Sequence, residues 1–125
     1  MTATTSPPKR IQRKRVKNWR KPDNTVIVDR TSRWGNPFRA DDCIANGFAD
    51  NEDDARKVCV EAYDGWLDGE PEYASVEPER RARILTDLHL LAGKDLACPC
   101  APGNACHGDS LIRRAAGLAA KVVTA

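Results

Sequence analysis

The sequence has no long hydrophobic run and no apolar segment near its N-terminus. No stretch approaches the roughly 20 apolar residues that a membrane-spanning helix requires. The first residues are polar or charged and lack the apolar core of a secretory signal peptide. These absences argue against a membrane protein and against a secreted protein. We therefore expect a cytoplasmic protein whose thiols are reduced and which has no membrane partner.

The sequence also lacks an even number of cysteines. Its 125 residues include five cysteines, and an odd count fits a disulfide framework poorly. In a reducing compartment, a cysteine cluster indicates a metal site or a reactive thiol instead. Hydrophobic residues make up 41% of the chain and charged residues 30%, which is typical of one globular domain with a modest core.

Acidic residues are missing from the first 21 positions. The formal net charge of +2 combines eight cations there with a net charge of −6 over the other 104 residues. A cation-rich arm with an aromatic residue commonly binds the phosphate backbone of a nucleic acid. Two alternatives remain open: a solvated tail, or docking onto the acidic surface of the body. The predicted nucleic-acid contacts in the arm (residues 10–21) are Arg13, Lys14, Arg15, Lys17, Trp19 and Arg20.

Patterning predicts a small α/β fold, a single-domain layered structure with a short parallel sheet and about three helices. The β-branched run Thr25–Val28 and the segment Asp95–Pro99 are the predicted strands. A third strand is expected around Arg15–Arg20 or near Phe38–Ile44, or a dimer completes the sheet. The predicted helices span Asn51–Asp68, Pro78–Ala92 and Asp109 to about Lys121, with Asp109 as the cap of the last. We expect a disordered leader at residues 1–9, the domain at 10–121 and a tail at 122–125.

Three stretches together carry a resemblance to a known family. They are the basic segment Arg10–Pro22, the loop Arg30–Phe38 with its Trp-Gly-Asn-Pro sequence, and the segment Gly93–Cys100 that continues to Cys106-His-Gly-Asp. In this order they resemble the domain-of-unknown-function family 4326 of bacteria and tailed phages, over about residues 10–120. The resemblance implies a phage-type or bacterial protein and brings no established activity, so the chemistry is argued from the residues.

The cysteine-histidine segment is the strongest candidate for a chemical site. Strand alternation puts Cys98 and Cys100 on one face, and the intervening Ala-Pro-Gly-Asn-Ala stretch can return Cys106 and His107 over them. Three thiolates and one imidazole complete a tetrahedral zinc set, so zinc is the expected cofactor. Core cysteines with a histidine that caps a helix are the alternative.

Two catalytic interpretations of this segment also remain open. A thiolate at a strand–loop–helix junction can be a nucleophile. Zinc with only three protein ligands would instead leave a position for water, with a nearby carboxylate as base. The candidate catalytic residues are Cys106, His107 and Asp109. A phosphatase loop is disfavoured, because the position that needs arginine holds Cys106.

The loop after the first strand could share a pocket with these cysteines. Ligands bind at the carboxyl ends of parallel strands, and both segments follow a strand. The candidate substrate or phosphate contacts are Arg30, Ser32, Arg33, Trp34 and Asn36; a structural turn with Trp34 in the core is the alternative. We expect a nucleotide- or nucleic-acid-acting protein with a zinc site beside this loop. The alternatives are a noncatalytic zinc-stabilised nucleic-acid-binding module and a protein-interaction factor.

Overall fold

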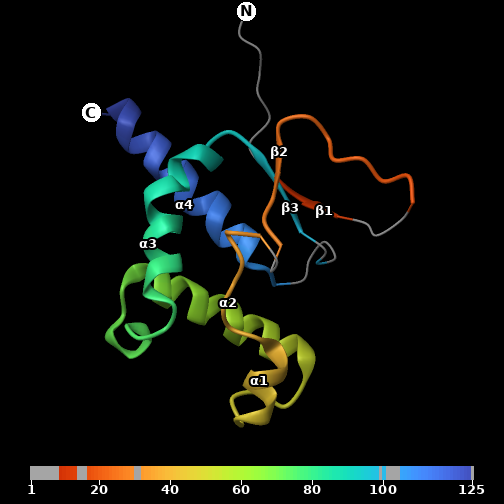
Figure 1. Ribbon diagram of the computed structural model, residues 1–125, viewed down its shortest axis with the longest axis vertical. Helices are drawn as coiled ribbons and strands as arrows, with labels where there is room; N and C mark the ends of the chain where they lie inside the picture. Colours follow the sequence, from red (N-terminus) through yellow and green to blue (C-terminus); the bar gives the residue numbers. More distant parts are fainter. Residues whose placement is uncertain (1–8, 14–16, 30–31, 99, 101–104, 125) are drawn as a thin grey trace, which may run out of the picture.

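A three-stranded parallel sheet organises the protein (Figure 1). The computed structural model describes residues 9–13, 17–29, 32–98, 100 and 105–124. Strand β3 (Asp95–Cys98) lies in the middle, between β1 (Arg10–Gln12) and β2 (Thr25–Ile27). All strands run in the same direction. The connection from β2 to β3 contains the helices α1 to α3, as the α/β prediction requires for parallel neighbours.

The third strand was predicted in the wrong place. It is Arg10–Gln12, whereas residues 17–20 form a turn and extended chain, and Phe38–Ile44 leads into a helix. Three residues are too few for an alternating pattern to be visible in a sequence. The strand forms because β3 offers it a partner, with Ile11 opposite Ala97 in the register.

The described residues also form four α-helices and two short 3-10 helices, joined by turns and loops. The predicted Pro78–Ala92 helix is divided into an α-helix and a 3-10 helix. The final helix starts at His107, two residues before the predicted cap Asp109. It continues to Thr124, through residues that were expected to form a tail. The helices are α1 (Ala40–Ala45), α2 (Glu52–Asp68), α3 (Pro78–Asp87) and α4 (His107–Thr124), with the 3-10 helices η1 (Pro71–Tyr73) and η2 (Leu88–Leu91).

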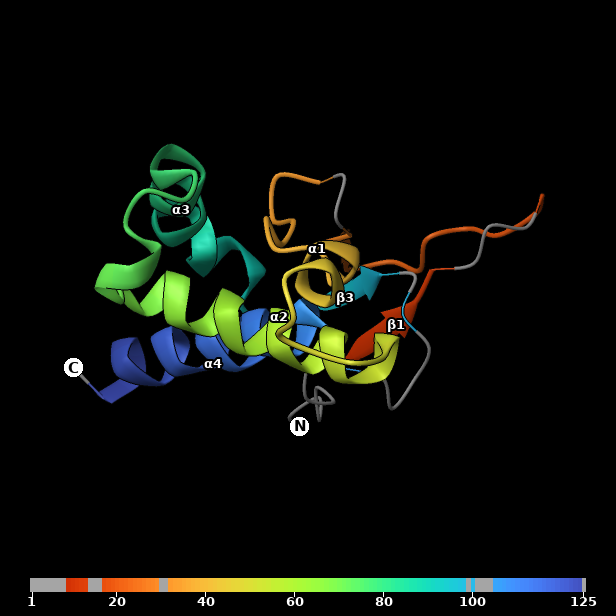
Figure 2. The same cartoon turned by 90° about the horizontal axis from the view of Figure 1, so that it is seen from below.

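Local signals explain where α2 begins and ends. The Asn51 side chain accepts a hydrogen bond from the backbone N–H of Asp54 at 2.9 Å, which caps the first turn. Gly69 ends the helix in the left-handed conformation with φ +84°. Figure 2 shows α2 and α4 running alongside each other, and Arg114 of α4 bonds Asp64 and Asp68 of α2.

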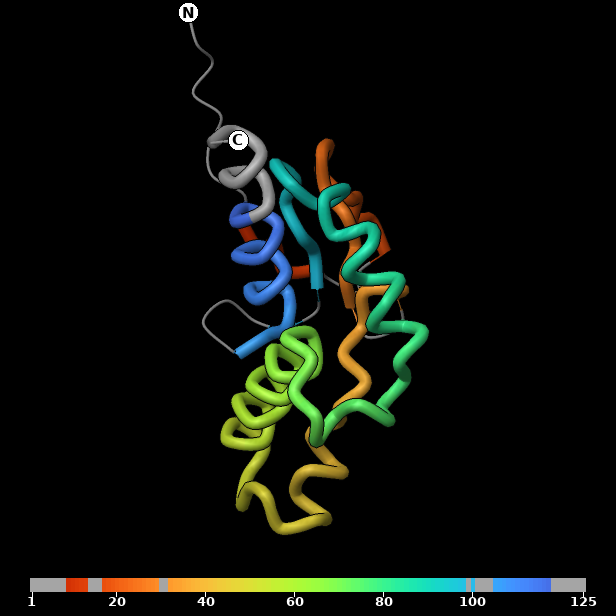
Figure 3. Tube along the Cα trace, turned by 90° about the vertical axis from the view of Figure 1, so that its left-hand side faces the viewer, coloured from red at the N-terminus to blue at the C-terminus, as the bar shows by residue number. Residues whose placement is uncertain are grey.

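The main core lies between these helices and the sheet. Figure 3 shows α4 alongside β3, which it contacts. The buried members include Tyr63 and Trp66 of α2, Leu96 of β3 and Leu111 of α4. Tyr63 donates a hydrogen bond from its hydroxyl to the carbonyl of Trp34 at 2.9 Å. The core therefore fixes the carboxyl ends of the strands relative to the start of α4.

Candidate metal centre

The predicted cysteine segment lies at the carboxyl edge of the parallel sheet. β3 ends at Cys98, and α4 begins at His107 directly after Cys106. Backbone hydrogen bonds continue past the strand ends on both sides of β3: Arg13 N–H donates to the Cys98 carbonyl at 2.6 Å, and Val28 N–H donates to the Ala97 carbonyl at 2.8 Å. The edge where parallel α/β sheets bind ligands is therefore held on both sides.

Three thiols meet at this edge. The sulfur atoms of Cys98, Cys100 and Cys106 all lie within 4.8 Å of one another, and the Cys98 and Cys106 sulfurs are 3.1 Å apart. None of the three is in a disulfide. Zn–S bonds of about 2.3 Å in a tetrahedron place neighbouring sulfurs about 3.8 Å apart. The cluster thus fits a thiolate-bound metal after small side-chain movements.

The thiols are electrostatically unequal. The pKa of Cys98 lies far below its ordinary value, because Cys100, Cys106 and the Arg10 guanidinium form hydrogen bonds that favour its thiolate. The pKa of Cys106 is raised, because its thiol hydrogen-bonds to Cys100 and Cys98 and because it is buried. These hydrogen bonds therefore favour the thiolate form of Cys98, and a metal ion would displace the protons of the other thiols.

Arg10 also belongs to the site, although the sequence did not predict this role for it. Its Nη1 lies 3.5 Å from the Cys98 sulfur and 3.5 Å from the Cys100 carbonyl oxygen. Its Nε lies 3.2 Å from Asp109 Oδ1, and only 10% of the side chain is exposed. Three thiolates and Zn²⁺ carry a net charge of −1, which this guanidinium balances. Nothing in the sequence separates Arg10 from the other cations of the arm.

Gly108 permits the close packing of this group. A Cβ atom there would lie 3.4 Å from Arg10 Cδ and 3.6 Å from the Cys106 sulfur. The Gly108 N–H also donates to the Cys106 sulfur at 3.4 Å. The first turn of α4 therefore contributes a backbone donor to the cluster, and the missing side chain makes room for Arg10.

His107, the predicted fourth ligand, lies outside the group of three close sulfur atoms. Its Nε2 lies 2.5 Å from the carbonyl oxygen of Val28, and its ring is 5.2 Å from the ring of Tyr63. The residue is 8% exposed. Asp109, the predicted base, is ion-paired with Arg10. Of the three candidate catalytic residues, only Cys106 belongs to the thiol cluster.

A pocket of about 170 Å³ opens beside the cluster. Cys100, Cys106 and His107 line it together with residues of α2. Among the described candidate substrate residues, Asn36 is the one that reaches this pocket, so the two predicted loops meet there through one residue. The remaining lining residues are Ala40, Glu52, Arg56, Cys59, Val60 and Ala105.

The Trp-Gly-Asn-Pro loop has clear structural contacts. Trp34 is 4% exposed in the core, and Ser32 donates from its hydroxyl to the Asp29 carbonyl at 2.7 Å. Asn36 donates to the Cys59 carbonyl at 3.0 Å and accepts from the N–H of Phe38 at 2.9 Å. These contacts agree with the structural-turn interpretation.

Two cations of this loop differ in placement. Arg33 is ion-paired with Asp87 and lies 4.8 Å over the ring of Trp34. Asp87 lies at the end of α3, and Arg33 does not line the pocket beside the thiols. Arg30 lies outside the described residues.

The basic arm is anchored at its base and exposed beyond it. Arg13 is ion-paired with Asp29 at 2.5 Å. Residues 17–24 project from the sheet away from the helices (Figure 1). Within the described part of the chain, Lys17 and Arg20 are exposed and form no ion pair, whereas Trp19 is half-buried. Lys14 and Arg15 lie outside the described residues, as does the predicted leader apart from Lys9.

Comparison with known protein families shows which family the chain belongs to. Residues 11–117 match the family described as Domain of unknown function (DUF4326). The chain belongs to the DUF4326 family. The match begins in β1 and ends within α4, so it includes the basic arm from Ile11 onward and the whole thiol cluster, and Arg10 lies one residue before it. No curated protein and no solved structure is significantly similar to the chain.

The structure also bears on the prediction that the chain does not span a membrane. Among the described residues, no helix of this DUF4326 domain combines the length and the apolar character needed to cross a membrane.

Proposed function

We propose that this DUF4326 protein is a zinc-stabilised nucleic-acid-binding module. Cys98, Cys100 and Cys106 bind the zinc ion as thiolates, and the basic arm that leaves the same edge of the sheet binds the phosphate backbone. The observation that carries the proposal is the convergence of three free thiols within 4.8 Å at the carboxyl ends of the strands.

The donor set supports zinc in particular. Soft thiolates select zinc, copper(I) or iron–sulfur clusters over magnesium and calcium. Zinc bound here would link the end of β3 to the start of α4, the two segments that provide the thiols. A cytoplasmic location, which remains part of the proposal, keeps the thiols reduced and available.

The surroundings of the cluster favour a structural role for the metal. A zinc hydrolase needs a group that takes the proton of the bound water. His107 hydrogen-bonds the Val28 carbonyl, and Asp109 pairs with Arg10, so both candidate groups already have structural partners. Arg10 also donates to Cys98, which lowers the reactivity of a metal-bound thiolate and fixes its orientation.

The arm supplies the surface for nucleic acid. The start of the arm is fixed to the carboxyl edge of the sheet, where the thiols lie, by the hydrogen bond from Arg13 N–H to the Cys98 carbonyl. Lys17, Arg20 and Lys21 are exposed and form no ion pair with another described residue. Cations that are not neutralised within the protein remain available to phosphates, whose binding releases counterions.

Metal analysis of the purified protein tests the zinc site. We expect one zinc per chain, and a cobalt-substituted protein whose absorption shows thiolate-to-metal charge transfer. Cys43→Ser provides the control, because Cys43 belongs to a separate buried cluster with Cys59 and Ala55. Substoichiometric metal in the wild type, or metal lost equally in Cys43→Ser and Cys98→Ser, would reject the proposal.

The salt dependence of DNA binding tests the arm. The double variant Lys17→Ala/Arg20→Ala is expected to weaken duplex binding and to reduce the slope of log K against log salt by about 1.8, since each phosphate contact contributes about 0.9. Lys57→Ala/Arg83→Ala is the matched control, because both residues are exposed on α2 and α3. Equal slopes for the two double variants, measured by fluorescence anisotropy, would remove the arm from the proposal.

A zinc hydrolase that acts on nucleotides is a second candidate, favoured by the pocket that Cys100 and Cys106 line. Three protein ligands leave a coordination position for water. Imidazole or azide added to the cobalt protein distinguishes the two functions. A shift of the d–d absorption bands shows the exchangeable fourth position that the hydrolase requires, whereas an unchanged spectrum shows a closed coordination sphere and rejects the hydrolase.

A further inference from the structure

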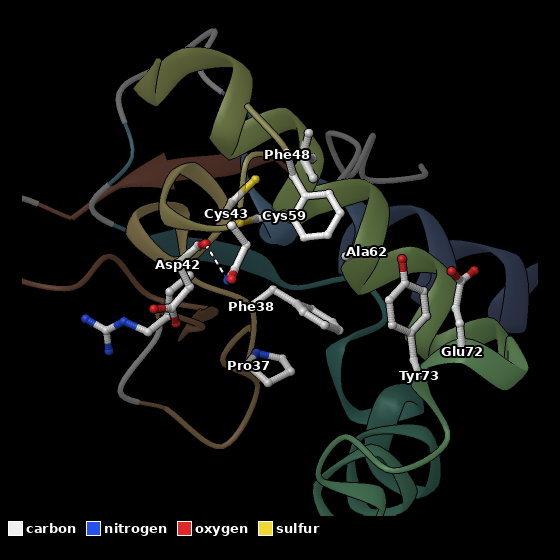
Figure 4. Close-up of a pocket in the computed structure, with 12 residues that line it drawn as sticks. Pro37, Phe38, Asp42, Cys43, Phe48, Cys59, Ala62, Glu72 and Tyr73 are labelled. Atoms are coloured by element: carbon white, nitrogen blue, oxygen red, sulfur yellow. Dashed lines mark hydrogen bonds between the residues drawn. The ribbon is translucent and has the colours of Figure 1, made fainter. Parts of the chain in front are cut away.

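A second and larger pocket lies between α1, α2 and η1, away from the thiol cluster. Its volume is about 330 Å³, within the range of small-molecule sites. The walls are mostly apolar side chains, with a few polar groups at the rim (Figure 4). The lining residues used below are Phe38, Arg39, Phe48, Ala62, Glu72 and Tyr73.

Aromatic rings form two sides of this pocket. Phe38 packs edge-on against Tyr73, with ring centroids 5.2 Å apart, and against Trp66, with centroids 6.4 Å apart. Figure 4 shows Phe48 on the opposite side of the pocket from Phe38. The arrangement leaves a space between aromatic side chains, which suits a flat ring because stacking and edge-to-face contacts are both available.

Phe48 is held in place by its backbone although its ring is exposed. Gly47 is left-handed with φ +80°, its N–H donates to the Ile44 carbonyl, and the N–H of Phe48 donates to the Cys43 carbonyl at 3.0 Å. These two hydrogen bonds together form the Schellman motif, in which the residue after the glycine normally packs onto the helix. Here the Phe48 side chain is 71% exposed. An exposed phenylalanine whose backbone is already fixed by hydrogen bonds loses little backbone entropy when a ligand covers it.

The pocket also offers polar groups for the edge of a ring. The Tyr73 hydroxyl has no hydrogen-bond partner among the residues that the structure describes, and Figure 4 shows it directed along the pocket wall near Ala62. Burial and the charge of Glu72 raise the pKa of Tyr73, which keeps the hydroxyl protonated as a donor. Arg39 and Glu72 add a cation and an anion at the rim.

We propose that this pocket binds the planar ring of a heteroaromatic ligand of nucleobase size. Phe48 and Phe38 contact its faces, and the Tyr73 hydroxyl bonds an acceptor at its edge. The volume is too small for a helix of a protein partner, and the polar groups favour a ring with nitrogen and oxygen atoms over a hydrocarbon.

The site is distinct from the thiol site and goes beyond the proposed function. Glu52, Arg56 and Val60 of α2 line the thiol pocket, whereas Val58 and Ala62 line the aromatic pocket. Positions four apart share a helix face, so these two sets belong to different faces of α2. Cys59 lines both pockets.

Amide chemical shifts in the zinc-loaded full chain test the proposal, with adenosine as the probe and cyclohexanol as the aliphatic comparator. Adenosine is expected to shift the amides of Cys43, Phe48, Val58 and Tyr73. Phe48→Ala should raise its dissociation constant about 5-fold or more, as for a lost base-stacking contact. Tyr73→Phe should raise it about 2- to 10-fold through loss of one hydrogen bond. Leu90→Ala, an exposed apolar residue on η2, is the matched control and should have no effect.

Three results would overturn the proposal. They are no shifts at millimolar adenosine, shifts confined to the amides of Cys100, Cys106 and His107, and equal affinity for adenosine and cyclohexanol. Zinc content, measured in the same samples, distinguishes a failure of the zinc proposal from a failure of the aromatic-pocket proposal. Phe48→Ala retains zinc whether or not the aromatic pocket binds adenosine, and a cluster without zinc leaves the shifts at Phe48 unaffected.

Discussion

Removing zinc is expected to lower the melting temperature of the protein by about 10 °C, and Cys98→Ser is expected to lower it by at least as much in the presence of zinc. A ligand at 100 times its dissociation constant stabilises the folded state by about 2.7 kcal/mol, which corresponds to roughly this shift for a domain of this size. Cys98 ends the central strand and is fully buried. The substitution therefore removes a metal ligand and places a hydroxyl at a fully buried position.

Differential scanning calorimetry with and without a zinc chelator checks this expectation. The decisive quantity is the difference between the two melting temperatures, because a buried serine lowers stability even without a metal. Wild type and Cys43→Ser should both show the difference, whereas Cys98→Ser should show none. A chelator that leaves the wild-type melting temperature unchanged would contradict a stabilising zinc ion.

Trp66→Ala is expected to destabilise the fold by about 3–5 kcal/mol, as for other large aromatic residues removed from a core. Trp66 is 1% exposed and packs against the rings of Phe38 and Tyr63. Its Nε1–H donates to the Val76 carbonyl at 2.7 Å, which joins α2 to the segment before α3. The substitution leaves a cavity and also removes the donor of that carbonyl.

Urea unfolding followed by circular dichroism measures this loss. Trp66→Phe separates the two contributions, since it keeps most of the ring packing and should cost about 1–3 kcal/mol for the unpaired carbonyl and the smaller ring. Leu90→Ala should change the free energy of unfolding by less than about 0.5 kcal/mol, because half of that side chain is exposed. A Trp66→Ala loss as small as that of Leu90→Ala would show that this core contact is unimportant.

The elements with strong local signals were predictable from the sequence. The helix predicted over Asn51–Asp68 is confirmed as α2, with Asn51 as its cap and Gly69 as its left-handed end. Gly93 is left-handed with φ +77° and follows η2. The β-branched run that begins at Thr25 forms β2. Capping groups and left-handed glycines act over a few residues, so a sequence contains all the information that determines them.

Elements that depend on distant partners were not predictable. β1 has three residues and exists through its pairing with β3. α1 has six residues, too few to show a helical period, and is held by its contact with α2. Asp109 has the properties of a helix cap, but its carboxylate pairs with Arg10, which lies almost the whole length of the chain away.

The candidate site shows the same division. Cys98, Cys100 and Cys106 lie together, as the sequence predicts, although β3 ends at Cys98 and Cys100 lies beyond the strand. The direction of the His107 ring could not be inferred, because it depends on the Val28 carbonyl at the end of β2. Which of two adjacent side chains faces a cluster is decided by the position of α4, a tertiary property.

The central place of β3 also determines when the chain can fold during its synthesis. β1 and β2 emerge first, yet each pairs only with β3, and the hydrogen bond from Lys9 to Asp95 spans 86 residues. Both early strands must therefore wait without a neighbour until three quarters of the chain has left the ribosome. α1 and α2 can associate during that interval, because they are close in sequence. The thiols meet only when α4 has started to form, so metal capture would be among the last events of folding.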